Sequence, residues 1–324
     1  MIDQKTGAIW IREDEVAQLL PMDQAIAALD DAFRAWAEGK AENRPRARVY
    51  APGAILHVMS AAWSEAGVMG LKSYSVTRES VRFKVLLYDT HTGRLLALIE
   101  ANRLGQIRTG AATGLATQYL ARPEASTVGL VGAGWQARSQ LEAVCAVRPI
   151  QGIRVYSRTP ETLAQFCTEM SAQLGLPVEP AGSAEAAVQG QEILIAATSA
   201  RDPVVLGRWL EPGQHLNAVG ANQIARRELD TEGVVRSHVV VVDSKEQARI
   251  ESGDLMLPIS EGQLAWEDVL ELMELVAGRA SGRKTPQDIT LFKSLGLALE
   301  DIAVGNYVYR QAVEQGLGER LPFE

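Results

Sequence analysis

The sequence holds only two cysteines, Cys145 and Cys167, among its 324 residues. So few thiols support neither a disulfide framework nor a metal cluster, and small buried hydrophobes are the favoured interpretation. Apolar runs are no longer than a strand, so no membrane span is expected. The charged first residues lack the apolar core of a signal peptide. We therefore expect a cytoplasmic protein that is not embedded in a membrane and holds no metal.

Positive charge is also scarce, with 32 Lys and Arg against 40 Asp and Glu and a net charge of -8. No basic tail or stripe is present, which argues against nucleic acid as the main partner. A local basic pocket for a small anion remains compatible with this balance. The composition, 47% hydrophobic and 22% charged, is that of an ordinary globular protein, and the length suggests about two domains.

Two kinds of periodicity divide the chain. After helical patterns at residues 12–20 and 23–40, the second with Asp23 expected as N-cap, apolar residues alternate with polar ones in five segments separated by short turns: residues 46–50, 55–60, 68–76, 81–89 and 94–101. Short turns between neighbouring strands predict a largely antiparallel sheet. A helix rich in small residues, 106–120, then leads to a link at Arg122-Pro123.

From residue 127 to 244, near-continuous apolar strands alternate with helices, which predicts a doubly wound parallel sheet covered on both faces. A further amphipathic helix is expected at 264–277, and a last long helix at 297–315. The predicted fold class is thus α/β, a Rossmann-type sheet plus a second α+β domain. We place the dinucleotide-binding domain at residues 122–293 and the second domain at residues 1–121 with 294–324.

The segment around which the chain is organised is TVGLVGAGWQA, residues 127–137. It has the G-x-G-x-x-A form of a dinucleotide-binding turn, with a buried-strand pattern before it and a helical pattern after it. Gly132 permits the tight turn, and Gly134 lets backbone approach a pyrophosphate. Ala137 is small enough for the helix to lie close to the sheet. The free N–H groups and positive dipole end of the helix suit phosphates.

The end of the second parallel strand indicates which dinucleotide is bound. An acid at that place accepts hydrogen bonds from the ribose hydroxyl of NAD, but here the strand ends in Ser157-Arg158-Thr159. A guanidinium flanked by two hydroxyls suits a 2′-phosphate. We therefore favour NADPH, with NADH possible and a solvated Arg158 as the alternative interpretation. Ligands bind beyond the carboxyl ends of parallel strands, which also selects Thr198 and the stretch from Val219 to Asn222.

Along nearly its whole length the chain resembles the ornithine cyclodeaminase/μ-crystallin family. The segments that carry the resemblance are RTGAA (108–112), GLVGAGWQARSQLEA (129–143), NAVGAN (217–222) with RREL (226–229), VVVDS (240–244) and ITLFKSLGLALED (289–301). The resemblance implies a homodimer built through the antiparallel domain, to which the last helix returns. It also implies a substrate with an α-carboxylate and an α-amine or α-imine.

By position, the resemblance implies that Arg46, Lys72 and Arg108 hold the substrate carboxylate. Three cations converging in one pocket of an acidic protein would in any case need an anion. Three arginines, Arg44, Arg46 and Arg48, crowd one strand, so the register there is open. The positions that fall where the family contacts the dinucleotide, beyond the glycines Gly132 and Gly134, are Ser80, Arg108, Trp135, Gln136, Ser157, Arg158, Thr159, Thr198, Val219, Asn222, Arg226 and Ser294.

Two positions depart from the cyclodeaminases of this family. They have an aspartate where this chain has Asn222, and a glutamate where it has His57. An asparagine cannot act as a general base, which argues against strict ornithine cyclodeaminase activity. His57 is either a titratable substitute for the glutamate or simply a polar residue on a strand.

The favoured hypothesis is an NADPH-dependent reductase of small α-imino acids, of the ketimine or 1-pyrroline-2-carboxylate type. Lys72 would donate a proton to nitrogen, and Asn222 would orient the substrate or the nicotinamide. An ornithine cyclodeaminase or an alanine-type amino-acid dehydrogenase is the second hypothesis. A non-enzymatic NADPH-dependent binding protein of the crystallin type is the third. The exact substrate and the physiological direction are not set by the sequence.

Overall fold

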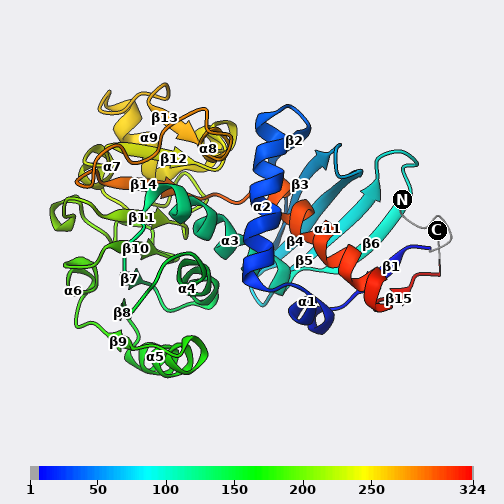
Figure 1. Ribbon diagram of the computed structural model, residues 1–324, viewed down its shortest axis with the longest axis horizontal. Coiled ribbons are helices and arrows are strands. Elements are labelled where there is room, and N and C mark those ends of the chain that lie inside the picture. The colour runs from blue at the N-terminus through cyan, green and yellow to red at the C-terminus, as the bar shows by residue number, and fades with distance from the viewer. Residues whose placement is uncertain (1–6, 323–324) are drawn as a thin grey trace. The chain divides into compact units, whose positions relative to one another are not determined.

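The computed structural model describes residues 7–322 and divides the chain into two compact units. Unit 1 contains the described residues up to Arg108 and from Gly296 onward, and unit 2 is Thr109–Leu295. The division falls within one long helix, α3 (Asn102–Leu120), and just before the last helix. The last segment of the chain therefore belongs to the same unit as the first (Figure 1).

Unit 1 is built on a seven-stranded sheet with the order β15-β1-β6-β5-β4-β3-β2. All neighbours pair antiparallel except β1 and β6, which are parallel. In chain order its elements are β1 (Ile9–Ile11), α1 (Glu13–Leu19), α2 (Met22–Ala37), β2 (Ala41–Ala51), β3 (Ala54–Trp63), β4 (Val68–Thr77), β5 (Val81–Asp89), β6 (Leu95–Glu100), α11 (Ala298–Gln315) and β15 (Glu319–Arg320).

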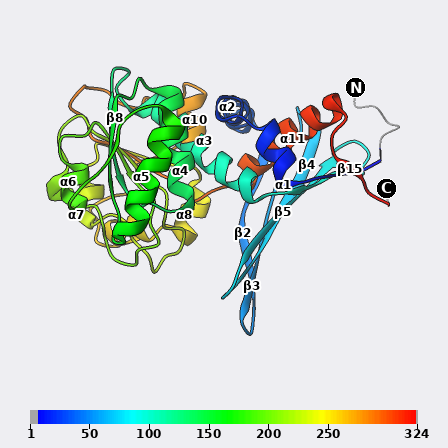
Figure 2. The same cartoon turned by 90° about the horizontal axis from the view of Figure 1, so that it is seen from below.

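Helices α2 and α11 lie on the same side of this sheet (Figure 2). Side chains along each strand alternate between the face covered by these helices and the opposite face. Met59 on β3, Lys72 on β4 and Val85 on β5 are buried beneath the helices and lie opposite one another in register. Gly70 allows close contact with α11, because an added Cβ would lie 2.6 Å from Ile302 Cδ1. Intervening residues such as Leu71 point to the other face, which no helix of unit 1 covers.

Unit 2 is an eight-stranded parallel sheet with the order β13-β12-β14-β11-β10-β7-β8-β9. Its elements after α3 are β7 (Thr127–Val131), α4 (Trp135–Val147), β8 (Gly152–Tyr156), α5 (Pro160–Leu174), β9 (Val178–Pro180), α6 (Ala184–Val188), β10 (Ile193–Ala196), the 3₁₀ turn Gly207–Trp209, β11 (His215–Ala218), α7 (Thr231–Val235), β12 (Val239–Val242), α8 (Lys245–Glu251), α9 (Gly253–Ser260), β13 (Val269–Glu271), α10 (Leu272–Val276) and β14 (Thr290–Lys293).

Two apolar clusters cover the faces of this sheet. Alternate residues of one strand contribute to opposite clusters: Ile193 and Ile195 pack with α4 and α5, whereas Leu194 and Ala196 pack with α6, α7 and α8. The two cores confirm the doubly wound arrangement expected from the apolar strands.

The structure differs from the local expectations in five places. Residues 264–277 form β13 and the short α10 rather than one helix, and α9 was not expected. Strand β14 was missed although it lies between β11 and β12. The short β9 was missed as well. Helix α2 begins at Met22 with Pro21 as N-cap, so Asp23 lies in the first turn.

Candidate active site and dinucleotide site

A buried cluster of charges in unit 1 brings together two of the predicted substrate residues. The Lys72 Nζ lies 2.8 Å from Asp301 Oδ1, and Arg108 Nε lies 3.2 Å from the same oxygen. Arg108 Nη1 also lies 2.8 Å from Glu300 Oε2. Both carboxylates are fully buried, and the Lys72 side chain is 2% exposed. The residues come from three distant segments, β4, α3 and the start of α11.

Arg46 is the third member of this cluster, and its place answers the question of register on β2. The pairing of β2 with β3 shifts between Arg44 and Ala47, at Pro45. Arg46 is turned inward, 7% exposed, and donates to Met59 Sδ at 3.4 Å and to the Gly296 carbonyl at 3.3 Å. Arg44 is instead exposed and paired with Glu42.

The start of α11 is held in place by specific contacts. Asn43 Oδ1 accepts the Leu299 N–H at 3.0 Å, and Glu300 accepts the Leu297 N–H at 3.3 Å, so two of the open N–H groups of the helix start are satisfied. Gly296 adopts φ of 81°, and a Cβ there would lie 2.5 Å from Arg108 Nη1. A glycine at this turn therefore leaves room for the guanidinium.

The cluster places three cationic side chains close to two buried carboxylates. Lys72 and Arg108 pair with Glu300 and Asp301, and Arg46 lies near enough to Lys72 to affect its charge. Burial and the neighbouring Arg108 lower the pKa of Lys72 to about 8, although Asp301 opposes the shift. A concentration of cationic groups of this kind suits an anionic ligand, and the Lys72 amine can give or take a proton near neutral pH.

An aromatic row lies beside this cluster on the same face of the sheet. His57 stacks on Tyr74 with ring centroids 4.1 Å apart and planes 6° apart, and Tyr74 continues to Phe83 at 4.9 Å. The Lys72 Nζ lies 5.0 Å from the centre of the Phe83 ring. Burial, with help from Arg48 and Arg46, lowers the pKa of His57 to about 4, so its imidazole is neutral at pH 7. The row is thus an uncharged aromatic surface, with the Phe83 ring tilted by 32° from the Tyr74 ring.

In unit 2 the predicted glycine turn connects β7 to α4. Gly132 has φ of 114°, and a Cβ there would lie 2.4 Å from the Ala197 carbonyl oxygen, so the turn requires glycine. A Cβ on Gly134 would meet nothing within 4 Å. Gly134 is the N-cap of α4, and glycine has no side chain that could cap the first N–H groups of the helix. Open space and a helix start with uncapped N–H groups fit a pyrophosphate.

The side chains next to this turn are accessible. Trp135, the first residue of α4, is 57% exposed, and Gln136 Oε1 is buried without a hydrogen-bond partner. At the end of β8, Arg158 and Thr159 are exposed and Ser157 is half-buried, with no acid among them. These residues fit a dinucleotide at the carboxyl edge of the sheet.

The other predicted cofactor residues of unit 2 also follow strand ends. Thr198 lies just past β10, and Val219 and Asn222 follow β11. Ser294 directly follows β14, where its N–H donates to Ala218 O at 3.1 Å and its hydroxyl to Asp243 at 3.5 Å. Arg226 is half-buried in the loop after Asn222. These residues share one edge of the sheet with the glycine turn.

Ser80 is the one predicted cofactor residue in unit 1 other than Arg108. It lies in the turn between β4 and β5, where its N–H donates to Thr77 Oγ1 at 3.1 Å. Sequence reasoning missed Glu300 and Asp301, although both stand in a segment that carries the family resemblance. It also gave no role to Glu228, which is fully buried beside Thr198. Acidic residues in the first turn of a helix commonly interact with the helix dipole, so no feature of the sequence marked Glu300 and Asp301 as site residues.

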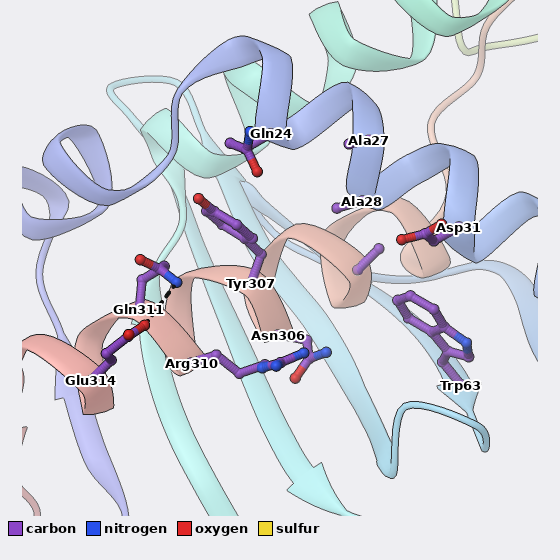
Figure 3. Close-up of a pocket in the computed structure, with 11 residues that line it drawn as sticks. Gln24, Ala27, Ala28, Asp31, Trp63, Asn306, Tyr307, Arg310, Gln311 and Glu314 are labelled. Carbon is purple, nitrogen blue, oxygen red and sulfur yellow. Dashed lines mark hydrogen bonds between the residues drawn. The ribbon is translucent and has the colours of Figure 1, made fainter.

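A separate pocket of about 310 Å³ lies between α2 and α11 in unit 1 (Figure 3). Its walls carry Gln24, Asp31, Trp63, Tyr307 and Arg310, and it contains none of Arg46, Lys72 or Arg108. The pocket is thus distinct from the charge cluster. Within residues 7–322, no group of three or more His, Cys, Asp or Glu is placed to hold a metal ion. No helix in that part of the chain is long and apolar enough to cross a bilayer.

The fold and these sites define a class, that of two-unit proteins with a Rossmann-type parallel-sheet domain and a separate, mostly antiparallel sheet unit that contains a buried charge cluster. The family model described as "Ornithine cyclodeaminase/mu-crystallin family" matches residues 9–316, and the chain belongs to this family. The sequence resemblance is therefore confirmed, and so is the predicted fold class.

Three relatives illustrate the range of the family. A Delta(1)-pyrroline-2-carboxylate reductase of Bacillus cereus is 39% identical over 263 residues, 79% of this chain and 81% of that protein. The structure of the reductase of the same name from Thermococcus litoralis, in complex with NADH and L-proline, matches with a TM-score of 0.93 and 38% identity over 97% of this chain and 100% of the other. An alanine dehydrogenase of Archaeoglobus fulgidus is 33% identical over 97% of this chain and 98% of that protein.

Proposed function

We propose that this protein is an NAD(P)H-dependent reductase of small α-imino acids, of the 1-pyrroline-2-carboxylate or ketimine type. The observation that carries the proposal is the buried cluster that brings Lys72 and Arg108 together with Arg46 nearby, because three cationic side chains suit a carboxylate. The similarity to two pyrroline-2-carboxylate reductases supports it. A reduced nicotinamide would supply the hydride for the imine carbon.

The residues of unit 1 have separable tasks in this proposal. Arg46 and Arg108 bind the carboxylate, because guanidinium pairs with carboxylate oxygens in a fixed geometry. Lys72, a cation with a lowered pKa, donates a proton to the nitrogen as the imine becomes an amine. The aromatic row His57–Tyr74–Phe83 forms an uncharged floor beside Lys72, which suits an apolar ring better than a second ammonium group.

The residues of unit 2 bind the cofactor. Gly132, Gly134 and the start of α4 cradle the pyrophosphate, with Trp135 and Gln136 beside it. Thr198, Val219, Asn222, Arg226 and Ser294 line the nicotinamide end, and Ser80 and Arg108 remain predicted cofactor residues of unit 1. Arg158, between Ser157 and Thr159, favours NADPH over NADH, since no acid is present to bind a free ribose hydroxyl. The Thermococcus litoralis complex holds NADH, so both cofactors are compared in the test.

A second candidate is an amino-acid dehydrogenase, which the archaeal alanine dehydrogenase favours with 33% identity over 97% of this chain. Ornithine cyclodeamination is disfavoured because Asn222 and a neutral His57 stand in place of acids. A non-enzymatic NADPH-binding role would give tight cofactor binding with no turnover.

A substrate panel separates these functions. Purified protein is mixed with NADPH or NADH and imino acids, with NADP and amino acids, or with ornithine and catalytic NAD. The proposal expects stoichiometric oxidation of NADPH by 1-pyrroline-2-carboxylate. Ammonia release from ornithine without net cofactor oxidation would identify a cyclodeaminase instead. Equal or tighter binding of NADH would contradict the cofactor preference.

We further propose a homodimer built through the uncovered face of the unit 1 sheet, and a cytoplasmic location. The homodimer is supported by the exposed Leu56 and the apolar residues near it on β3 and β4. The cytoplasmic location is supported by the free thiols of Cys145 and Cys167 and by the need for a reduced dinucleotide.

A further inference from the structure

Glu228 joins two loops at the carboxyl edge of the unit 2 sheet. One carboxylate oxygen, Oε1, accepts the Thr198 N–H at 2.7 Å and the Thr198 hydroxyl at 2.8 Å. The other, Oε2, accepts the Gly220 N–H at 2.6 Å and the Ala221 N–H at 3.2 Å. Thr198 follows β10 and Gly220 follows β11, so one side chain fixes the chain beyond two neighbouring strands.

The two loops are close enough that no side chain fits between them. A Cβ on Gly220 would lie 2.1 Å from the Thr198 carbonyl oxygen and 2.5 Å from Glu228 Oε1. The backbone of Glu228 is held in turn by Asp254, whose Oδ1 accepts the Glu228 N–H at 2.6 Å and the Leu229 N–H at 2.9 Å. Asp254 pairs with Lys293 at 3.1 Å at the end of β14. The carboxylate thus joins two half-buried loops to the fully buried Asp254 and Lys293.

This network lies where a dinucleotide-binding sheet presents its ligand. Ligands of open parallel sheets bind beyond the carboxyl strand ends, and Thr198 and residues 219–222 form that edge here. The N–H groups that Glu228 binds lie beyond the last residues of β10 and β11, so these hydrogen bonds fix the loops and not the sheet ladder. Because Glu228 already holds these loops in one conformation, less conformational entropy is lost when a cofactor binds.

We propose that Glu228 is a positioning residue that holds the Thr198 and Gly220–Ala221 loops in the geometry that the nicotinamide end of the cofactor requires. This inference rests on the proposed reductase function, and it assigns Glu228 no contact with the substrate. It predicts that losing one acceptor oxygen weakens cofactor binding and slows hydride transfer beyond any effect on stability.

The ionisation of Glu228 matters to this role. Burial and the nearby Asp254 raise its pKa to about 7, while Lys293 and the Thr198 hydrogen bonds oppose the shift. The ionised carboxylate accepts all four hydrogen bonds. In the protonated form the Thr198 hydroxyl is the partner that can accept instead of donate, because the other three partners are backbone N–H groups.

Glu228→Gln tests the proposal, because the amide has the same shape but only one acceptor oxygen. Glu192→Gln is the matched control. Glu192 stands just before β10, at the opposite edge of the same sheet, and accepts from Ser126 N at 2.7 Å and from Arg122 Nη2 at 2.7 Å. The Kd for NADPH is measured by nicotinamide fluorescence, unfolding by thermal melting, and the deuterium isotope effect on kcat with deuterated NADPH.

We expect E228Q to raise the Kd for NADPH roughly tenfold and to increase the isotope effect, while E192Q changes the Kd by less than about twofold. An unchanged Kd and isotope effect in folded E228Q would overturn the proposal. If E228Q does not fold, E228D replaces it: the shorter acid keeps the charge but cannot reach both loops, and wild-type binding by E228D would equally overturn it. If wild-type protein reduces no imino acid, the proposed function fails, whereas the NADPH measurement still decides the role of Glu228.

Discussion

At the scale of single residues, the pKa of Lys72 sets the pH dependence of the reaction. Its lowered value of about 8 means that the ammonium form is lost as pH rises through that value. Reduction needs the ammonium as proton donor, so kcat/KM for the imino acid should be level below about pH 8 and fall above it. The reverse oxidation needs the neutral amine and should rise over the same range. A rate of reduction that increases above pH 8 would contradict this role.

Replacing the amine tests the same role directly. Lys72→Met keeps the volume and removes the proton, and should lower turnover by roughly a hundredfold or more while leaving NADPH binding intact. The folded state is checked by thermal melting, because Asp301 then retains only Arg108. Near-normal turnover by the variant would rule out Lys72 as the donor.

Arg46 and Arg44 form a matched pair for carboxylate binding. In Arg46→Met, Asp301 keeps its contacts with Lys72 and Arg108, and Glu300 keeps its contact with Arg108. We expect KM for the imino acid to rise about tenfold to a hundredfold, since a charged hydrogen bond to substrate is lost. Arg44→Met, on the exposed side of the same strand, should leave steady-state kinetics unchanged. Equal effects of the two changes would place the carboxylate elsewhere.

The sequence alone could select Lys72 and Arg108 but not their partners. Family resemblance pointed to the cations, whereas Glu300 and Asp301 depend on a return of the chain from residue 296, which no local pattern reveals. The register on β2 could not be predicted either, because the irregularity at Pro45 decides which arginine turns inward.

At the scale of elements, alanine substitutions at the two glycines of the turn should distinguish an effect on folding from an effect on cofactor binding. Gly132→Ala places a Cβ 2.4 Å from Ala197 O at a positive φ, so it should lower the melting temperature measurably. Gly134→Ala meets nothing within 4 Å and should leave the melting temperature unchanged, yet weaken NADPH binding by occupying the pyrophosphate space. Titration by fluorescence checks the second effect. Unchanged NADPH affinity in Gly134→Ala would place the pyrophosphate away from this turn.

The long periodic elements were predictable, whereas several of the short ones were not. Helices α2 and α5 and strands β4 and β5 were found within a few residues, because each spans several repeats of its period. Strands β9, β13 and β14 have only three or four residues. Their pairing with neighbours far along the chain makes them strands, and this context is invisible in a local window.

At the scale of the whole molecule, we expect the uncovered face of the unit 1 sheet to be buried against a second copy of the chain in a homodimer. Leu71 points to this face, so Leu71→Glu should place a charge in the interface and shift a dimer toward monomer in sedimentation. Val313→Glu on the exposed side of α11 is the control and should stay dimeric. A wild-type monomer at micromolar concentration would contradict the proposed assembly.

The central claim is that hydride passes from the nicotinamide to the α-carbon of a small imino acid held by its carboxylate. Its most direct test is mass spectrometry of the product formed from 1-pyrroline-2-carboxylate and deuterated NADPH. The account predicts proline with one deuterium on its α-carbon, formed in equal amount to the NADPH oxidised. Unlabelled product, or oxidation of NADPH without proline, would contradict it.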